Sequence, residues 1–150
     1  MRARSCRQPW RLSVGKGYCA TLTLTLPPQR ANSRLHWAQL KRLEDRWAKR
    51  AIVTLANSRK RPTAPLERFT LHCIVYAKGR AMDRDGATAR LKRAIDLLCG
   101  SPKNVKGVGI VHRTPRWLAG DSPEHMVGLT VESSRDWDNP RLEIHVDEVL

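Results

Sequence analysis

The chain has 150 residues, of which 41% are hydrophobic and 28% are charged, and it carries a formal net charge of +14 at pH 7. This length and composition predict one globular domain, and the chain contains no internal repeat or low-complexity tract. No run approaches the ~20 apolar residues of a membrane span, and the four cysteines include no C-x-x-C pair, which disfavours a zinc ribbon or finger and favours reduced thiols in a cytosol.

The first predicted element is a strand that follows a basic arm. Residues 1–17 are expected to form this loosely ordered arm. No continuous apolar core follows it, so a secretory signal is not expected. A single domain is expected over residues 18–150. In "YCATLTLTL", threonine and leucine alternate from Thr21 to Leu26, and this period of two predicts a strand with one buried face. The prolines of "PPQRANS" end the strand, since proline cannot continue a central ladder.

A helix is predicted next, from about Ser33 to Ala56, with Asn32 or Ser33 as its N-cap. Its apolar residues recur at spacings of three and four and are expected to face the core: Leu40, Leu43, Trp47, Ala51 and Leu55. The opposite face is basic and carries Lys41, Arg42, Lys49 and Arg50. The basic linker "NSRKRPTAP" then leads to the second half of the chain.

A second strand and a second helix follow the linker. "ERFTLHCIVYA" alternates again and predicts a strand with Phe69, Leu71, Cys73 and Val75 on one face. Behind Asp85, apolar residues take the spacing of an amphipathic helix, which Gly100 is placed to end. The apolar stripe of this helix consists of Ala87, Leu91, Ala94, Ile95 and Leu98.

The last third of the chain is predicted to be mostly turns and strands. "SPKNVKGVGIVHRTPRWLAGDSP" is long and rich in turn residues, with at most a short strand at Val108–His112. "HMVGLTVES" and "RLEIHVDEV" predict two further strands. The order strand, helix, strand, helix, strand, strand predicts an α/β or α+β domain, in which two main helices pack on one small mixed sheet.

The positive charge is distributed unevenly along the chain. Residues 1–62 hold 15 Lys and Arg against only Glu44 and Asp45, whereas residues 63–150 hold 13 Lys and Arg against 12 acids. Such asymmetry favours a polyanionic partner, and nucleic acid before a membrane surface. The alternative is a basic protein that has no such partner.

Two aspartates, Asp83 and Asp85, stand one residue apart where the second helix begins. In an extended segment they would point to the same side and repel each other unless a cation lay between them. Hard oxygen ligands of this kind suit Mg²⁺ or Mn²⁺. The alternative is that both are helix N-terminal acids, which the helix dipole favours and which include a good N-cap type.

Further charged residues are candidates for the same site. Lys92 lies about two helical turns after Asp85 and is expected on roughly the same face, where a lysine can stabilise charge on a metal-bound phosphate. Its alternative role is a solvated lysine paired with Asp96. A third acid is supplied by Asp121 in "AGDSPEHM", although an Asx turn also explains that residue. Spacing alone does not favour Asp121 over Asp136 or Asp138.

Three motifs occur in one order: "LPPQRANSRLHW", then "MDRDGATARLKRAIDLL", then "GDSPEH". Together they resemble the RusA-type Holliday-junction resolvases and their phage-borne relatives, over about residues 20–148. The family pattern is a Pro-Pro turn with a nearby asparagine, a D-x-D-N motif that opens a lysine-bearing helix, and a later loop with D-D-S-P-E-H or D-D-A-Q. Asn32 matches the asparagine after the Pro-Pro turn.

The resemblance implies a small homodimeric Mg²⁺-dependent endonuclease, with a mixed sheet and helices, that cuts four-way DNA junctions symmetrically. The family's metal ligands fall on Asp83, Asp85 and Asp121, and the helix lysine of many phage relatives falls on Lys92. In other members the catalytic lysine lies four residues after the second aspartate, at a position that is alanine here. Glycine also replaces two further family residues: the asparagine of D-x-D-N, at Gly86, and the first aspartate of the D-D pair, at Gly120.

The expected function is therefore resolution of four-way DNA junctions by phosphodiester hydrolysis in recombination and repair, in the cytoplasm of a bacterial or phage-infected cell. Mg²⁺, or Mn²⁺ in its place, is the expected cofactor. DNA-backbone contacts are expected from the cationic residues Lys41, Arg42, Lys49, Arg50, Arg84 and Arg90. Two alternatives stay open: a basic DNA-binding phage accessory protein with weakened catalysis, and a metal-dependent nuclease that prefers flaps or replication forks.

Overall fold

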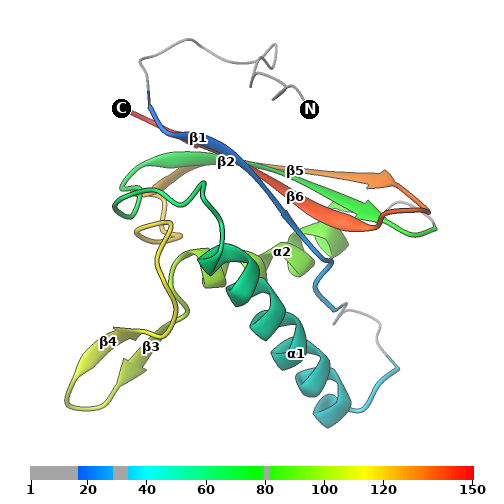
Figure 1. Cartoon of the computed structure of the whole chain (residues 1–150). Coiled ribbons are helices and arrows are strands. Elements are labelled where there is room, and N and C mark those ends of the chain that lie inside the picture. Colours follow the sequence, from blue (N-terminus) through cyan, green and yellow to red (C-terminus); the bar gives the residue numbers. More distant parts are fainter. Residues whose placement is uncertain (1–16, 29–33, 80–81) are drawn as a thin grey trace.

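The computed structural model describes residues 17–28, 34–79 and 82–150 and shows two helices packed against one face of a four-stranded mixed sheet (Figure 1). The elements in chain order are β1 (Cys19–Leu24), α1 (Trp37–Ala56), β2 (Phe69–Ala77), α2 (Arg84–Leu98), β3 (Pro102–Val105), β4 (Gly109–His112), β5 (Met126–Arg135) and β6 (Arg141–Glu148). The predicted α+β class is confirmed. Most of the predicted basic arm, residues 1–16, lies outside the described residues, as do Asn32 and Ser33.

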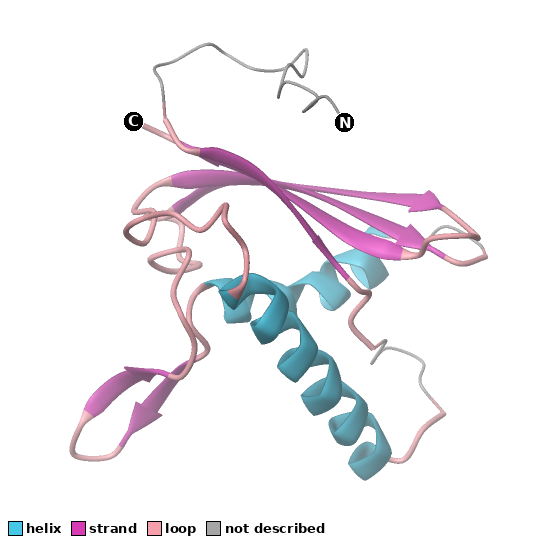
Figure 2. Cartoon of the chain, viewed as in Figure 1, coloured by secondary structure: helices cyan, strands magenta, loops and turns pink. Residues whose placement is uncertain are grey.

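The sheet has the strand order β1-β6-β2-β5. Strand β6 pairs antiparallel with both β1 and β2, whereas β2 and β5 run parallel, with Leu71 opposite Leu129 and Cys73 opposite Val131. The parallel pair is possible because α2, the hairpin and the loop after it form the long connection that parallel strands require. Figure 2 shows both helices on the same side of this sheet.

The core lies between the helices and one face of the sheet. Every second residue of β2 is buried, beginning with Phe69, as the alternation predicted. Strand β6 follows the same pattern through Leu142, Ile144 and Val146. The thiols of Cys73 and Cys99 are buried in this core, as their apolar surroundings predicted. The period of two in the sequence therefore identified the buried face of the central strands.

Helix α1 differs from the prediction in its start and in its buried face. It begins at Trp37 rather than near Ser33, and the His36 ring caps it by accepting a hydrogen bond from the Ala38 N–H. Leu43 is 37% exposed, while Glu44 is buried. The buried residues of α1 form one face, Glu44, Trp47, Ala48, Ala51 and Leu55, and Leu43 lies outside it. Figure 1 also shows the N-terminal end of α1 projecting away from the sheet. Only the later part of the predicted stripe is buried, and it includes Trp47, Ala51 and Leu55.

Helix α2 follows the prediction closely. The predicted stripe from Ala87 to Leu98 is buried, and the helix ends at the expected glycine. Gly100 has a φ of +86°, the Ser101 N–H donates to the Asp96 carbonyl, and the Gly100 N–H donates to the Leu97 carbonyl. This is the Schellman arrangement, which satisfies the last carbonyls of a helix and reverses the chain.

The turn-rich segment after α2 forms a small separate hairpin of β3 and β4, where the sequence predicted at most one short strand. The chain then returns to the core. Trp117 and Leu118 are buried, and their N–H groups both donate to the Leu98 carbonyl, while the Leu66 N–H donates to the Trp117 carbonyl. These bonds attach the loop to the end of α2. Neither described helix has the length and apolar character needed to cross a membrane.

Candidate functional site

The first two acids of the candidate site lie at the start of α2. Asp83 is the N-cap, and one of its carboxylate oxygens accepts a hydrogen bond from the Gly86 N–H at 2.8 Å. Asp85 lies in the first helical turn, where the helix dipole favours an acid. The same-side rule for residues two apart holds for extended backbone, and it does not apply here because the chain is helical from Arg84 onward. The argument from extended backbone therefore does not hold at Asp85, and metal binding by the pair stays a prediction.

The third acid lies beside the later half of the same helix. Burial raises the pKa of Asp96, and the negative charge of Asp121 raises it further. The same two acids act on Cys99, where burial, followed by Asp121 and Asp96, raises the thiol pKa to about 12. Asp121 is therefore close enough to the second half of α2 to act on Asp96 and Cys99. From the sequence, Asp96 was a candidate for a further acid near the site, although a salt-bridge or structural role was favoured.

The charge of Asp121 acts on the later half of α2, whereas Asp83 and Asp85 lie at the start of that helix. Asp85 and Asp96 are eleven residues apart, which corresponds to about 16 Å along a helix axis. In the part of the chain that the structure describes, no group of three or more His, Cys, Asp or Glu side chains is disposed to hold a metal ion. Mg²⁺ often takes only one or two protein carboxylates, together with water and phosphate oxygens. By ligand type the exposed Asp83, Asp85 and Asp121 all suit that ion.

Lys92 is exposed on α2, and its charge lowers the pKa of Asp96, opposing the effect of burial and Asp121. Arg93 acts on Asp96 in the same direction, and its guanidinium also lies 3.9 Å from the Asp45 carboxylate of α1. Lys92 and Asp121 therefore both act on the Asp96 carboxyl, in opposite directions. This placement leaves the position four residues after Asp85, Ala89, without a cationic side chain.

Gly86 and Gly120, the two departures from the family pattern, both lie where a side chain would meet close neighbours. A Cβ at Gly86 would lie 2.9 Å from the Asp83 carboxylate oxygen that caps the helix. A Cβ at Gly120 would lie 3.0 Å from the His125 ring, whose Nδ1 is 2.7 Å from the Glu67 carbonyl oxygen. Placing the family's asparagine or aspartate here would require the helix cap or this histidine to move. The glycines are thus part of the local packing.

The predicted DNA-contacting cations belong to the two helices. Five of them are exposed, while Arg90 is half-buried and burial lowers its pKa. A groove of about 470 Å³ lies between α1 and α2, and the Asp45–Arg93 pair is part of its lining. The remaining lining residues are Trp37, Leu40, Lys41 and Glu44. The five exposed cations are Lys41, Arg42, Lys49, Arg50 and Arg84.

In three dimensions the charge separates by layer rather than by chain half. Residues 101–120, which include the hairpin, hold four Lys and Arg and no acid. Residues 121–150, which contain β5, β6 and the loops beside them, hold eight acids against Arg135 and Arg141. Helix α1 holds five Lys and Arg against two acids, and α2 holds four against two. The helices and the hairpin therefore each carry an excess of positive charge, and the C-terminal segment carries an excess of negative charge. A polyanion would be attracted to the helices and the hairpin.

The sheet face away from the helices carries a polar network that sequence reasoning missed. Thr21 Oγ1 lies 2.8 Å from His145 Nδ1, and the His145 ring stacks on that of His72 with centroids 5.5 Å apart. His72 in turn pairs with Glu132 at 2.9 Å. The contacts run across β1, β6, β2 and β5 in turn. Alternation placed these residues on the outer face, but only the strand register shows that they meet.

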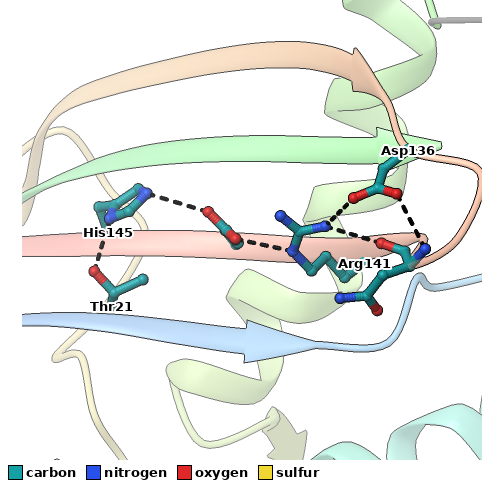
Figure 3. A network of polar contacts seen from close by, with 6 residues as sticks. Thr21, Asp136, Arg141 and His145 are labelled. Carbon is teal, nitrogen blue, oxygen red and sulfur yellow. Dashed lines mark hydrogen bonds and ion pairs between the residues drawn. The ribbon is translucent and has the colours of Figure 1, made fainter. Parts of the chain in front are cut away.

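A second part of the network is centred on Arg141. Its guanidinium lies 2.7 Å from the Asp136 carboxylate and 2.9 Å from the Glu143 carboxylate, and it sits over the Tyr76 ring at 3.8 Å. Figure 3 shows the line of contacts from Asp136 through Arg141 to His145 and Thr21. These contacts tie the β5–β6 turn to the sheet. Because the acids here are bonded to arginine within the chain, we assign Asp136 a structural role.

The histidines of this face predict a pH dependence of stability. Burial, followed by the His72 ring, lowers the pKa of His145 below its usual value of 6.5. Protonated His145 is therefore more favourable in the unfolded chain than in the folded one. Neutral His145 contributes stability above pH 6.5, and this contribution is lost as the pH falls through the folded-state pKa. We expect the loss in unfolding free energy between about pH 7.5 and about pH 5.5 to be smaller in His145→Gln than in the unaltered protein, measured by urea denaturation.

The control for this experiment is His112→Gln, which removes an exposed histidine from β4. It should leave the pH-dependent loss close to that of the unaltered protein. The charged neighbours Glu143, Asp147 and Glu132 act on His145 in the opposite direction, so the comparison of variants, and not the sign of the total pH effect, isolates this residue. Equal losses in the two variants would remove His145 as the cause.

Comparisons of this chain with protein-family models, with curated proteins and with solved structures gave no match.

Proposed function

We propose that this chain is a Mg²⁺-dependent endonuclease that acts on branched DNA and resolves four-way junctions, as the resemblance to RusA-type resolvases implies. The observation that carries the proposal is the placement of acids on a cationic helix layer. Asp83 and Asp85 are exposed at the start of α2, and Asp121 acts on Asp96 further along it. Acids that remain exposed inside a cationic surface are what a phosphodiesterase needs, because cations bind the backbone and carboxylates bind the ion.

The roles of this chain's own residues follow from the same arrangement. The exposed cations of α1, together with Arg84, would hold the phosphate backbone and supply most of the affinity without reading sequence. Lys92, with Arg90 nearby on α2, would stabilise negative charge that develops on the phosphate. A bound Mg²⁺ would supply an activated water for hydrolysis of the phosphodiester. Mn²⁺ offers the same oxygen-ligand chemistry.

A homodimer in the cytoplasm of a bacterial or phage-infected cell completes the proposal. Two-fold symmetry would present two equivalent sites to the two strands of a junction that must be cut. The same arrangement serves recombination and repair, where symmetric cuts separate the joined duplexes.

A second candidate function, a DNA-binding accessory protein without catalysis, is favoured by a specific observation. One oxygen of Asp83 already caps α2, and the glycines at positions 86 and 120 pack where the family carries polar side chains. Polar side chains that hydrogen-bond to metal ligands normally hold those ligands in position, and their loss weakens metal sites by about 10–100-fold. In this function the cations remain in use and the acids serve the fold.

One assay separates the two functions. Purified protein is incubated with a labelled four-way junction and with a linear duplex of the same sequence, in Mg²⁺ or in EDTA. The proposed nuclease nicks the junction only with Mg²⁺ and prefers it to the duplex. Binding of the junction with no nicking in Mg²⁺ or Mn²⁺ would assign the protein to the accessory class.

If nicking occurs, Asp83→Asn and Asp121→Asn are each expected to lower its rate by at least about 100-fold while junction binding is retained. Asparagine is chosen at position 83 because its side-chain oxygen still caps the helix, so the fold keeps the bond from the Gly86 N–H. Nicking rates and junction affinity in EDTA are measured on the same preparations.

The matched control is Asp138→Asn, an exposed aspartate in the β5–β6 turn on the acidic strands. Its nicking rate should equal that of the unaltered protein. Lys92→Ala tests the cationic role separately, and an unchanged turnover in that variant would transfer the role to Arg84 or Arg90. Full activity in either Asp83→Asn or Asp121→Asn would contradict the ligand assignment.

A further inference from the structure

The hairpin of β3 and β4 is the most exposed structured part of the chain. None of its eight strand residues is buried, and its two strands pair only with each other. Apolar side chains are concentrated around the turn, where Val108 is 72% exposed and Ile110 is 69% exposed. Val105 and Val111 are also exposed. Figure 1 shows the hairpin projecting from the body on the same side of the sheet as the two helices.

An apolar tip of this kind is unfavourable in water. A two-stranded hairpin is marginally stable by itself, and a group of exposed apolar side chains marks an interaction site. The hairpin is nevertheless held firmly at its base. The Gly100 carbonyl accepts hydrogen bonds from the Arg113 and Thr114 N–H groups, at 2.8 and 3.2 Å. The structure thus presents an apolar tip on a stem that is bonded to the end of α2.

The charge around the tip indicates what the tip contacts. Lys103 and Lys106 belong to the hairpin, Arg113 and Arg116 follow it, and residues 101–120 contain no acid. A partner must therefore offer anionic groups beside an apolar surface. Duplex DNA offers phosphates but keeps its base faces stacked, whereas the bases at a branch point can be unstacked at low cost. Apolar side chains inserted between bases are an established way to hold such an opening.

We propose that the β3–β4 hairpin inserts its tip, Val108 and Ile110, against the bases at the branch point of DNA, with Lys103 and Lys106 on the adjacent phosphates. The inference rests on the proposed function for its DNA partner, but it does not require cleavage. It assigns recognition of the branch to an apolar contact with bases, while the helices supply contacts to the backbone that any duplex offers.

The test uses the full chain in EDTA, so that cleavage plays no part. The double variant Val108→Ser/Ile110→Ser is compared with the unaltered protein for binding to a four-way junction and to a linear duplex. The junction carries 2-aminopurine at its centre, whose fluorescence rises when the base unstacks. We expect the unaltered protein to raise this fluorescence, and the variant to lose that rise and about tenfold of its junction preference, with duplex affinity retained.

Two further variants serve as controls. Val53→Ser replaces a valine that is 59% exposed on α1, and it should leave both readouts unchanged. Lys103→Gln/Lys106→Gln should weaken binding to junction and duplex alike and lower the slope of log affinity against log salt by about two. Melting temperatures should stay close to that of the unaltered protein, because the replaced side chains are exposed.

The outcomes distinguish this inference from the proposed function. No fluorescence rise in the unaltered protein, or equal junction preference in the tip variant, overturns the hairpin assignment even if the protein cuts junctions. A tip variant that loses self-association in sedimentation while keeping branch unstacking and junction preference also overturns it, since the tip would then contact a second copy. Branch unstacking by a protein that never nicks DNA would support the hairpin assignment and contradict the nuclease. Failure of the unaltered protein to bind any DNA overturns both.

Discussion

Replacement of Leu91 by alanine is expected to lower the free energy of unfolding by about 2–5 kcal/mol. Leu91 lies in the middle of α2 and is 1% exposed, in the core between the helices and the sheet. The substitution removes apolar surface that is buried on folding and leaves a cavity that the close-packed surroundings fill only in part. Urea denaturation, read by circular dichroism, measures the loss as a shift in midpoint at constant slope.

The matched control is Leu43→Ala on α1. The sequence placed Leu43 in the core, yet it is 37% exposed. Leu43 keeps about a third of its surface in water and lies outside the core cluster, and alanine is at least as good a helix former, so a loss of about 1 kcal/mol or less is expected. Losses of similar size in the two variants would contradict the position of α1 in the structure. The pair therefore tests the packing of both helices with one chemical change.

Gly100→Ala is the second large effect, with an expected loss of about 2–5 kcal/mol in unfolding free energy. Gly100 has a φ of +86°, a conformation that costs an L-residue about 1–2 kcal/mol. Its new Cβ would also lie 2.6 Å from Arg116 Cγ and 3.1 Å from both His112 Nδ1 and the Thr114 carbonyl oxygen. Moving backbone and side chains aside adds about 1–3 kcal/mol. Thermal and urea unfolding both measure the effect.

Gly107→Ala separates the two causes. Gly107 has a φ of +81°, but nothing lies within 4 Å of an added Cβ. This variant should therefore show only the conformational cost, about 1–2 kcal/mol, and it destabilises the exposed hairpin turn. If Gly100→Ala is no more destabilising than Gly107→Ala, the crowded contact at the end of α2 is not as the structure places it.

The central strands and α2 were predictable because their signals are local. The alternation of apolar residues in β2 and β6 shows which side chains share a face. In both strands the side chains on that apolar face are buried. The stripe of α2 works in the same way, and Gly100 ends the helix through bonds within five residues. Asp83 as N-cap is equally local, and it was one of the two interpretations that the sequence left open. Each of these features depends on contacts inside one element.

Helix α1 shows where such patterns fail. Leu43 has the spacing of a core residue, but it is exposed while the adjacent Glu44 is buried. The buried face of α1 therefore differs at this point from the predicted stripe. A helical repeat indicates the approximate buried face, whereas the elements packed against the helix decide which of its residues are covered. The helix begins at Trp37 with His36 as its N-cap, and histidine is not one of the residue types that usually mark a helix start.

The candidate site combines both kinds of information. The chemistry of Asp83, Asp85 and Asp121 can be read from residue types and spacing, and the resemblance to a nuclease family rests on them. Their arrangement cannot be read in that way, because the path of residues 101–120 decides that Asp121 acts on Asp96 in the later half of α2. The histidine network on the outer sheet face also depends on strand register.

By itself the sequence determined the fold class, the buried faces of the strands, the ends of α2 and the excess of cations, because each depends on nearby residues or on composition. Tertiary structure alone decided that the basic helices and hairpin lie on one side and the acidic strands form the other layer. It also decided that the "SPKNVKG" segment becomes part of a projecting hairpin. Chain closure and strand pairing join residues that are far apart, and no local pattern encodes those distances.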